Sequence, residues 1–569
     1  MATGISLLPP ELWISIASYT DVLTVLRICT ASRLFWCIFA KAQGLWQHLY
    51  HITFPDDASE SFWLASYRSR IAESTGTSVE KAHVDWRCAI TARRATVANW
   101  RLGRYTRRSC LVPELQKGRS DWLFIGFTPS ELLLRNHSQS LLCAVSATAT
   151  AANNTPSLVL LKEALPEEQV AAYVYGIGDY FTLLSTRNAW NDRYIWARRL
   201  AGEPAQRLVH KATIIDKRAN WVLALQDREP GVQVADSWLL LDVDGKRSPC
   251  YLAALCTFNL DDYNSDSLSD AEKASLLNSN YQNACIVTAS KDRATVCAIN
   301  GSATRLYWIV LEVAFDCNTG EQRKRGVCGR VRTLRTGCYS DAWDGDKRMT
   351  ALRVRALGGG YVYVSGSGLG CFAVLAATIN VLRASGTVQP LGVAARAASR
   401  KDLRTFEYGW LEYAMQDLIV PLTRRQLLVM ASRSTATQCN GERLVRLLRF
   451  HDGTVVALYQ LPASSFIDHI LDDLALVIAR HDEDYRLLLF DVYTGATVRV
   501  IRSAVYSTYP DLSKASPIYL FDALQQEPVR SADEKEHSRL VAASPEDKRK
   551  LLARHVCWLD FMPDIARQV

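Results

Sequence analysis

One pattern recurs from about residue 99 to the end of the chain: short runs of β-branched, leucine and aromatic residues, separated by clusters of Asp, Gly, Asn and Ser. Runs of this composition, bounded by turn residues, predict β-strands. In the clearest unit, residues 466–502, four strands are expected at 466–470, 474–479, 485–492 and 497–501. Further units are expected at 121–175, 180–210, 237–252, 306–327, 347–388 and 444–461.

A chain of such units has few ways to bury its apolar surface. Units of roughly 40 to 50 residues with about four strands each are typical of a β-propeller. One four-stranded sheet cannot cover its own apolar faces, so neighbouring sheets must cover them, and joining the last sheet to the first removes the open interface. A pair of β-sandwiches or a β-solenoid is the competing architecture.

The prediction is therefore a mainly-β propeller of seven or eight four-stranded blades over residues 97–569. Its closing blade is expected to be shared between residues 97–110 and the C-terminus. The polar and charged stretches near 259–280 and 507–547 are expected to be loop insertions between strands.

The charge balance argues against a nucleic-acid-binding or disordered chain. Lys and Arg total 66 against 58 Asp and Glu, a net charge of +8, in a sequence of which only 22% is charged and 49% is hydrophobic. A disordered polypeptide or one that covers nucleic acid would be more charged and less apolar. Nucleic acid is therefore not an expected partner.

Cysteine usage and the apolar segments indicate the cellular compartment. The 15 cysteines include no C-x-x-C pair, so a zinc site and a secreted disulfide framework both lack their usual sequence support. The first ten residues carry no basic segment before an apolar run, and the longest apolar stretch, residues 369–382, is shorter than the ~20 residues that a membrane span needs. We expect a protein of the cytoplasm, the nucleus or both, with no membrane partner.

Motifs for catalysis and metal binding are weak. Asp262, Asn264 and Asp266 begin like a calcium loop, but Ser267 and Lys273 stand where such a loop needs glycine and glutamate. Neither H-E-x-x-H nor G-x-S-x-G occurs. The sequence therefore predicts no catalytic residues, no metal, no cofactor and a chain that is not an enzyme.

The first hundred residues have a different, helical periodicity. Apolar residues at helical spacing predict three helices within residues 6–50, and Thr20-Asp21 is placed to cap the second of them. Further helices are expected over 61–94, interrupted near 74–78. We therefore divide the chain into residues 6–50, a helical linker at 51–96 and the strand-rich part.

Four segments of the chain resemble a known family. Leu8-Pro9-Pro10-Glu11-Leu12, with an isoleucine about four residues on, resembles the Leu-Pro-x-Glu-Leu opening of an F-box, and Leu45-Trp46-Gln47-His48-Leu49 resembles its closing Leu-Trp-x-x-Leu. Residues 62–68 are similar to the Trp-x-x-x-Tyr-Arg helix that often follows an F-box. Residues 99–103 resemble the Asn-Trp-Arg-x-Gly segment with which F-box proteins of the WD-repeat type begin their propeller, which implies an outer strand of the last blade.

The resemblance implies a function. An F-box docks on the Skp adaptor and, through it, on the cullin and RING subunits of an SCF-type ubiquitin ligase, while the propeller binds a protein substrate, phosphorylated in some members. The alternatives are a propeller scaffold whose F-box acts outside a ligase, a helical cap packed on the propeller, and a propeller enzyme. The residues expected to contact the adaptor are Leu8, Pro9, Glu11, Leu12, Ile16, Leu23, Leu26, Leu34, Phe35, Leu45, Trp46 and Leu49. The substrate-binding residues are not assigned.

Overall fold

The structure is a computed structural model of the whole chain, of which the following parts are described. They are residues 8–54, 58–77, 79, 81–111, 122–136, 141–146, 157–160, 169–177, 181–188, 193–199, 206–210, 212–226, 237–243, 249–256, 270, 281, 283–290, 292–301, 306–315, 329–339, 350–358, 361–367, 373–376, 419–422, 427–432, 442–449, 455–462, 466–471, 474–481, 484–502, 516–528 and 552–563.

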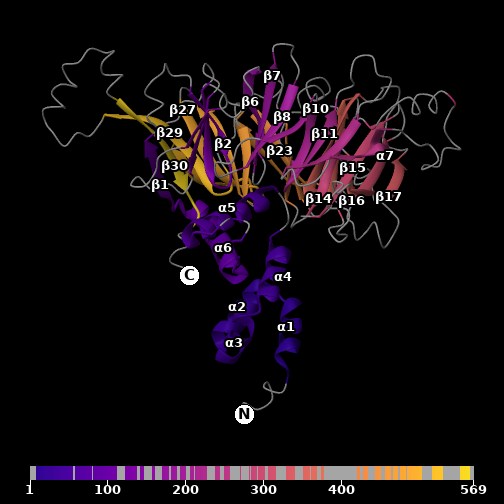
Figure 1. The fold of residues 1–569 in the computed structure, drawn as a ribbon. Coiled ribbons are helices and arrows are strands. Elements are labelled where there is room, and N and C mark those ends of the chain that lie inside the picture. The colour runs from indigo at the N-terminus through magenta and orange to yellow at the C-terminus, as the bar shows by residue number, and fades with distance from the viewer. Residues whose placement is uncertain are drawn as a thin grey trace, which may run out of the picture.

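Helices form the N-terminal part and project from the strand-rich part as a stem (Figure 1). The first four are α1 (Pro10–Ser18), α2 (Val22–Ala31), α3 (Arg33–Ala40) and α4 (Gln43–Thr53). The predicted cap of α2 is confirmed, because the Asp21 carboxylate accepts a hydrogen bond from the Thr24 amide at 3.0 Å. These bonds with Thr24 hold the pKa of the Asp21 carboxyl below its ordinary value.

The next two helices, α5 (Ala58–Thr75) and α6 (Trp86–Leu102), lie between this stem and the strands. Asp85 caps α6 by accepting from the Cys88 amide at 3.1 Å, and Gly103 ends it at φ +62°, a left-handed conformation that suits glycine. Residues 99–102 are therefore the last turn of a helix, which corrects the expectation of an outer strand at 99–103. The first strand begins a few residues later, at Thr106.

The described strands form eight sheets, six with four strands and two with three, and every pairing is antiparallel. The first two four-stranded sheets are β2 (Trp122–Phe127), β3 (Glu131–Asn136), β4 (Leu141–Ser146), β5 (Ser157–Leu160) and β6 (Gln169–Ile177), β7 (Phe181–Asn188), β8 (Arg193–Arg199), β9 (Gln206–His210). The next two are β10 (Ala212–Arg218), β11 (Trp221–Gln226), β12 (Ser237–Asp242), β13 (Cys250–Tyr251) and β14 (Asn283–Ala289), β15 (Arg293–Gly301), β16 (Leu306–Ala314), β17 (Arg330–Tyr339). A short helix, α7 (Ala253–Cys256), follows β13.

The remaining sheets complete the array. They are β18 (Thr350–Gly358), β19 (Tyr361–Ser367), β20 (Ala373–Ala376), then β21 (Ile419–Leu422), β22 (Leu427–Ser432), β23 (Glu442–Arg449), β24 (Val455–Pro462), then β25 (Phe466–Leu471), β26 (Leu474–His481), β27 (Asp484–Asp491), β28 (Thr497–Arg502), and last β1 (Thr106–Leu111), β30 (Leu552–Asp560), β29 (Tyr519–Pro528) in that spatial order.

The unit predicted over residues 466–502 is confirmed as a four-stranded sheet with boundaries close to those expected. Two other boundaries differ. The predicted unit 121–175 ends earlier, because β6 pairs with the strands that follow it. The stretch 507–547, expected to be an insertion, contains β29, which pairs with β30 along its whole length. Most of the expected insertion at 259–280 and the calcium-like loop at 262–273 lie outside the described residues.

A repeated backbone hydrogen bond shows which place β29 takes in its sheet. The Phe315 amide, just after the third strand β16, donates to the Asp292 carbonyl, just before the second strand β15, at 2.9 Å. The Phe561 amide, just after β30, donates in the same way to the Ile518 carbonyl, just before β29, at 2.9 Å. β29 and β30 therefore occupy second and third positions, and β1, from the other end of the chain, lies at the edge where other sheets have their fourth strand.

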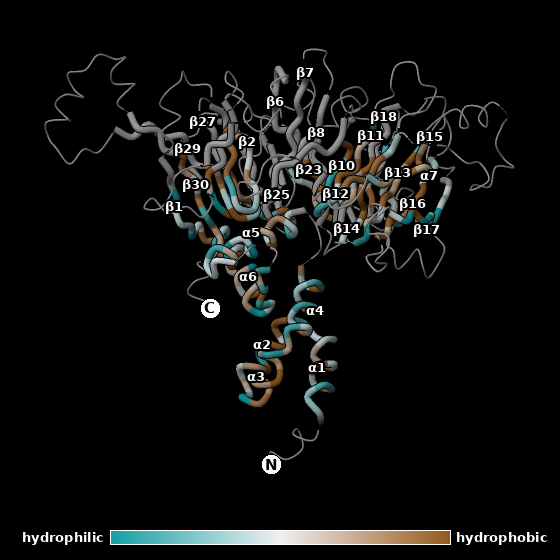
Figure 2. The backbone as a smooth tube through the Cα atoms, in the orientation of Figure 1, coloured by the Kyte–Doolittle hydropathy of each residue, from teal (hydrophilic) through white to brown (hydrophobic). Residues whose placement is uncertain are grey.

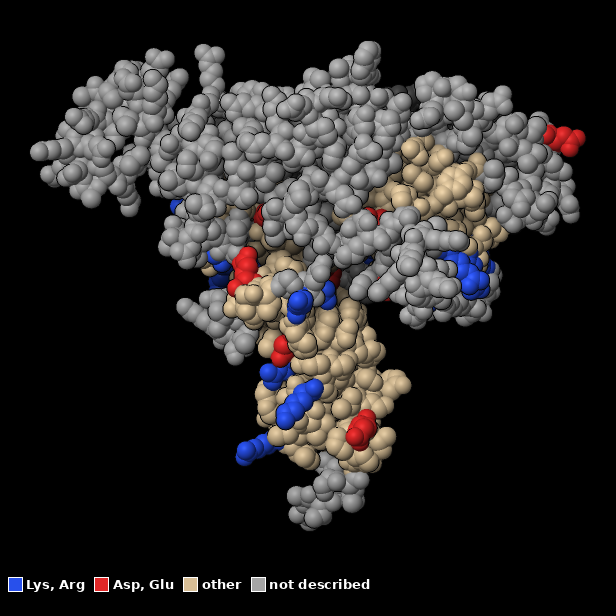
Figure 3. Space-filling view, in the orientation of Figure 1, with Lys and Arg blue, Asp and Glu red and all other residues tan. Residues whose placement is uncertain are grey.

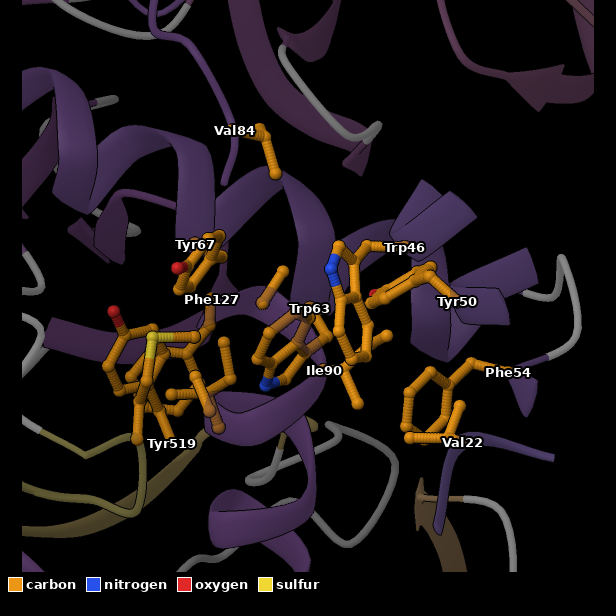
Figure 4. Close-up of a cluster of buried hydrophobic side chains, with 14 of the residues drawn as sticks. Val22, Trp46, Tyr50, Phe54, Trp63, Tyr67, Val84, Ile90, Phe127 and Tyr519 are labelled. Atoms are coloured by element: carbon orange, nitrogen blue, oxygen red, sulfur yellow. The ribbon is translucent and has the colours of Figure 1, made fainter. Parts of the chain in front are cut away.

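The largest apolar core joins the stem to the strands. It contains aromatic side chains from α4, α5, β2 and β29, and Figure 4 shows Trp46, Tyr50, Trp63, Phe127 and Tyr519 within it. Hydrophobic segments concentrate in the inner parts of the described sheets (Figure 2). Within the described ranges, no helix is both long and apolar enough to cross a membrane.

Candidate docking surface

One face of α1 carries large aliphatic side chains that the chain itself does not cover. Leu12 and Ile16 are four residues apart, which places them on one side of α1. Leu8 lies two residues before the helix begins. Leu8, Leu12 and Ile16 are 41%, 50% and 49% exposed. The opposite side of α1 is covered, because Ala17 is buried and Trp13 and Ile14 pack against the core. A helix with apolar residues on both sides buries only one of them within this chain.

Two further exposed leucines lie on the next helices. Leu23 on α2 is 44% exposed and Leu34 on α3 is 47% exposed. Both helices use their other side for packing: α2 buries Val22 and Val25, and α3 buries Phe39. Exposed leucines are common individually, but several within one small helical unit are typical of an interaction surface.

The closing motif of the resemblance has a different role. Leu45, Trp46 and Leu49 are buried in the core, and the Trp46 indole donates to the Phe39 carbonyl at 2.8 Å. These three residues hold α4 against the rest of the stem and do not lie on the exposed face. The sequence could not separate the two roles, because the apolar residue types are the same.

The twelve residues expected to contact an adaptor thus fall into three groups. Exposed are Leu8, Pro9, Glu11, Leu12, Ile16, Leu23 and Leu34; half-buried are Leu26 and Phe35; buried are Leu45, Trp46 and Leu49. We use the term docking surface below for the exposed group.

Two exposed aromatic residues of the stem were not predicted. Tyr19, at the end of α1, is 89% exposed, and Trp36 on α3 is 44% exposed with the Arg87 guanidinium 4.8 Å from its ring centroid. Their exposure depends on how α1 and α3 pack, for which the local sequence carries no signal.

A buried polar network ties α4 to α5 and α6. The Glu60 carboxylate accepts hydrogen bonds from the Tyr50 hydroxyl and from Arg93 Nε, the latter at 2.7 Å. Beside it, the Trp63 indole donates to the Thr96 hydroxyl at 3.1 Å. Burial raises the pKa of the Tyr50 hydroxyl well above its ordinary value, so it stays protonated and remains a donor.

A second buried network ties α5 to the last sheet. Arg70 donates to one oxygen of Asp560 at 2.5 Å, and Arg108 of β1 donates to the other at 2.6 Å. Arg70 also donates to the Tyr519 hydroxyl at 3.3 Å. A carboxylate held by two guanidinium groups is a charge-assisted contact that fixes orientation as well as distance.

The segment at 99–103 attaches the end of α6 to the last sheet. The Trp100 ring stacks on Phe561 with centroids 3.5 Å apart, and its indole donates to the Pro517 carbonyl at 2.9 Å. The Asn99 amide donates to the Phe561 carbonyl at 2.9 Å. The residues of the Asn-Trp-Arg-x-Gly resemblance therefore contact the C-terminal sheet from a helix rather than from a strand.

Metal-binding chemistry is absent from the described part of the chain, where no group of three or more His, Cys, Asp or Glu side chains could hold an ion. Most of the strand-rich region's outer loops lie outside the described residues, so no substrate-binding residue is assigned there.

No protein-family model matches the chain, and no curated protein matches it. Solved structures with a similar arrangement include prolyl oligopeptidase B from Galerina marginata (TM-score 0.34, 10% identity, 73% of this chain and 54% of that one). The β-propeller domain of the Trilobed protease from Pyrococcus furiosus matches with a TM-score of 0.31 and 7% identity over 68% of this chain and 95% of that one. A post-proline cleaving enzyme from Rickettsia typhi matches with a TM-score of 0.32 and 8% identity over 83% and 60%.

The strand-rich region therefore resembles propeller folds, in agreement with the expected class of architecture. This chain spans about half the length of prolyl oligopeptidase B, and likenesses this distant assign no activity.

The prediction that the chain is not an enzyme is withdrawn as a correction, because the similar structures include enzymes by name, prolyl oligopeptidase B and a post-proline cleaving enzyme, although their names assign no activity to this chain. The absence of short catalytic motifs could not support that prediction. Catalytic groups are recognised by their geometry and can come from distant positions in a chain.

Proposed function

We propose that the chain is a substrate-recognition subunit of an SCF-type ubiquitin ligase. Its N-terminal helices form an F-box that docks on the Skp adaptor, and its strand-rich region presents a protein substrate. The proposal rests on one observation above all. Of the residues that match the F-box opening, Leu12 and Ile16 form an exposed aliphatic pair on α1, and the exposed Leu8 lies two residues before the helix begins.

The energetics of these three side chains support docking. Each of them is about half exposed, and burying apolar area contributes roughly 25 cal/mol per Å². A helical unit of this size cannot cover them itself. Since the other side of α1 already packs against α3 and α4, a partner is the remaining way to bury them.

The connection between the two ends supports the second half of the proposal. Glu60 joins α4, α5 and α6, and Asp560 joins α5 to the last sheet. A stem held by buried ionic contacts keeps the docking surface and the strand-rich region in a fixed relation. A fixed distance between the two surfaces raises the effective concentration of a substrate held by the strand-rich region near a protein bound at the docking surface.

We include in the proposal that the strand-rich region is a closed propeller of eight blades, with β1 completing the sheet of β29 and β30. The equivalent backbone hydrogen bonds from Phe315 to Asp292 and from Phe561 to Ile518 support this assignment. A cryo-electron microscopy map of the chain bound to the adaptor is expected to show eight blades around one axis. A ring of seven blades, or an open array, would contradict it.

The docking claim is tested by binding of the full chain to purified Skp adaptor. The double variant Leu12→Glu/Ile16→Glu places two charges on the proposed interface and is expected to weaken binding at least about a hundredfold. The matched control is Leu102→Glu/Val500→Glu, in which both residues are equally exposed, at 50% and 49%, but lie on α6 and β28.

The control is expected to bind like the wild type. Equal binding by the two double variants, or no binding by the wild type, would refute the docking surface. Ubiquitylation of a captured protein by the reconstituted complex then distinguishes a ligase subunit from a scaffold that uses the same adaptor.

A further inference from the structure

The outer strand β17 has one edge that pairs with nothing in the described part of the chain. Its sheet has the order β14-β15-β16-β17, so among the described strands β17 pairs only with β16. It is ten residues long. The backbone N–H and C=O groups along a free edge are a template on which a further strand can add.

Three arginines of β17 lie on the same face of the sheet. Arg330 is opposite Ala314, Arg332 is opposite Glu312, and Arg335 is opposite Val310. Residues opposite one another point to the same face, and the three β16 partners are two residues apart. A bulge in β17 between positions 333 and 335 makes this possible, because without it Arg335 would fall on the other face.

The charge of that face is strongly one-sided. Arg293 of β15 belongs to the same row as Arg330, since both are opposite Ala314. Over the described residues of β15, β16 and β17, this face carries four arginines and one carboxylate, Glu312. Arg293, Arg330 and Arg332 are exposed. Lys and Arg side chains gather at the β17 end of the molecule in Figure 3.

Arg335 supplies an independent observation. It is partly buried, and its Nη1 is buried without a hydrogen-bond partner. A buried guanidinium nitrogen without an acceptor is destabilising, and such groups are rare in folded proteins. An acceptor from outside the chain, lying along the β17 edge, would satisfy it.

We propose that the free edge of β17 binds an extended acidic segment of a partner protein by strand addition. Alternate residues of an added strand point to the same face and lie about 6.8 Å apart. Asp or Glu at alternate positions would therefore stand opposite the arginine row, as Glu312 already stands opposite Arg332 on the other side. Strand addition supplies the backbone hydrogen bonds, and the arginines select acidic side chains. This surface is remote from α1, so the inference does not rest on adaptor docking.

The test uses the full chain and a short synthetic peptide in which Glu and Thr alternate. A second peptide of the same composition has the Glu residues in one block. The alternating peptide is expected to bind about tenfold more tightly than the blocked one, and Arg330→Glu/Arg332→Glu is expected to weaken its binding by at least the same factor. Hydrogen exchange of the β17 amides is expected to slow when the alternating peptide is present.

The matched control is Arg94→Glu/Arg104→Glu, which reverses the same number of charges at exposed positions on α6 and just after it. It is expected to bind the alternating peptide like the wild type, and both double variants are first checked for an unchanged unfolding midpoint. Equal affinity for the two peptides, equal loss in the two double variants, or no slowing of exchange in β17 would overturn the proposal. A single-stranded oligonucleotide that displaces the alternating peptide and binds more tightly would overturn it in favour of nucleic acid.

Discussion

Arg70 and Asp560 lie 490 positions apart in the chain, yet the Arg70 guanidinium donates to the Asp560 carboxylate at 2.5 Å in a buried contact. Arg108 binds the other oxygen of the same carboxylate. Arg70 belongs to α5, Arg108 to β1 and Asp560 to β30. The contact therefore fastens α5 to both ends of the strand-rich region. This carboxylate connects the two parts beside the apolar core and the Trp100 contacts.

We expect Asp560→Ala to lower the free energy of unfolding by about 3–5 kcal/mol, because the buried Arg70 guanidinium and the partly buried Arg108 guanidinium both lose this carboxylate. The comparison is Arg101→Met, which removes an ion pair with Asp491 that is longer, at 3.4 Å, and partly exposed. That pair is expected to contribute less than about 1 kcal/mol. Urea unfolding of both variants measures the difference, and equal losses would contradict the assignment.

Trp46 and Leu12 belong to the same family resemblance but are expected to respond differently to truncation. Trp46→Ala removes a side chain that is 1% exposed and hydrogen-bonded to Phe39, so it should destabilise the fold by about 3–5 kcal/mol. Leu12→Ala should change the free energy of unfolding by less than about 0.5 kcal/mol, because Leu12 is half exposed. Thermal unfolding separates the two effects before any binding is measured. A large loss of stability in Leu12→Ala would mean that α1 buries this face.

Gly103 is the glycine at which a side chain should be most harmful to the junction. Its φ is +62°, and an added Cβ would lie 2.5 Å from the Arg499 guanidinium, whose Nε donates to the Arg101 carbonyl at the end of α6. Gly103→Ala is expected to cost about 1–2 kcal/mol. Gly44→Ala is the control, since Gly44 lies within α4 with open space at its Cβ and the change should stabilise the chain by up to about 1 kcal/mol. Unfolding midpoints shifted in the same direction would contradict this reading.

Asp216 should make stability depend on pH. Burial raises the pKa of its carboxyl above the ordinary value of 3.8, although the Ile286 and Lys217 amides donate to it. The folded state therefore binds the Asp216 proton more tightly than the unfolded state does. The stability that this proton contributes is complete at pH values below the pKa of the unfolded state, and it is lost as the pH rises through the pKa of the folded state.

Asp216→Asn removes the titration. The unfolding midpoint of the wild type, measured relative to this variant, is expected to fall as the pH rises above the ordinary carboxyl pKa of 3.8. An unchanged or rising difference would contradict the raised pKa. Glu312→Gln is a suitable comparison, because Glu312 is a partly exposed carboxyl of the neighbouring sheet β14–β17.

Much of the secondary structure could be predicted because its signals are local. The strands over 466–502 and the cap at Asp21 depend on residues a few positions apart, and both were predicted close to where they occur. The helix through residues 99–102 was missed, since the family resemblance favoured a strand there. Its left-handed glycine end and the burial of Trp100 on a helical face decide the outcome.

The sequence by itself determined that apolar and turn residues alternate along most of the chain, and that the N-terminus follows helical spacing. Those patterns act over a few residues, so they set the type of each element. Only the tertiary structure decided that Leu12 stays exposed while Trp46 is buried. A sheet shared between residues 97–110 and the C-terminus was expected, and the structure identifies the two strands as β1 and β30. It also decided, through a bulge, that three arginines share one face of β17. Each of these depends on which elements pack together, and contacts between residues hundreds of positions apart leave no local mark in a sequence.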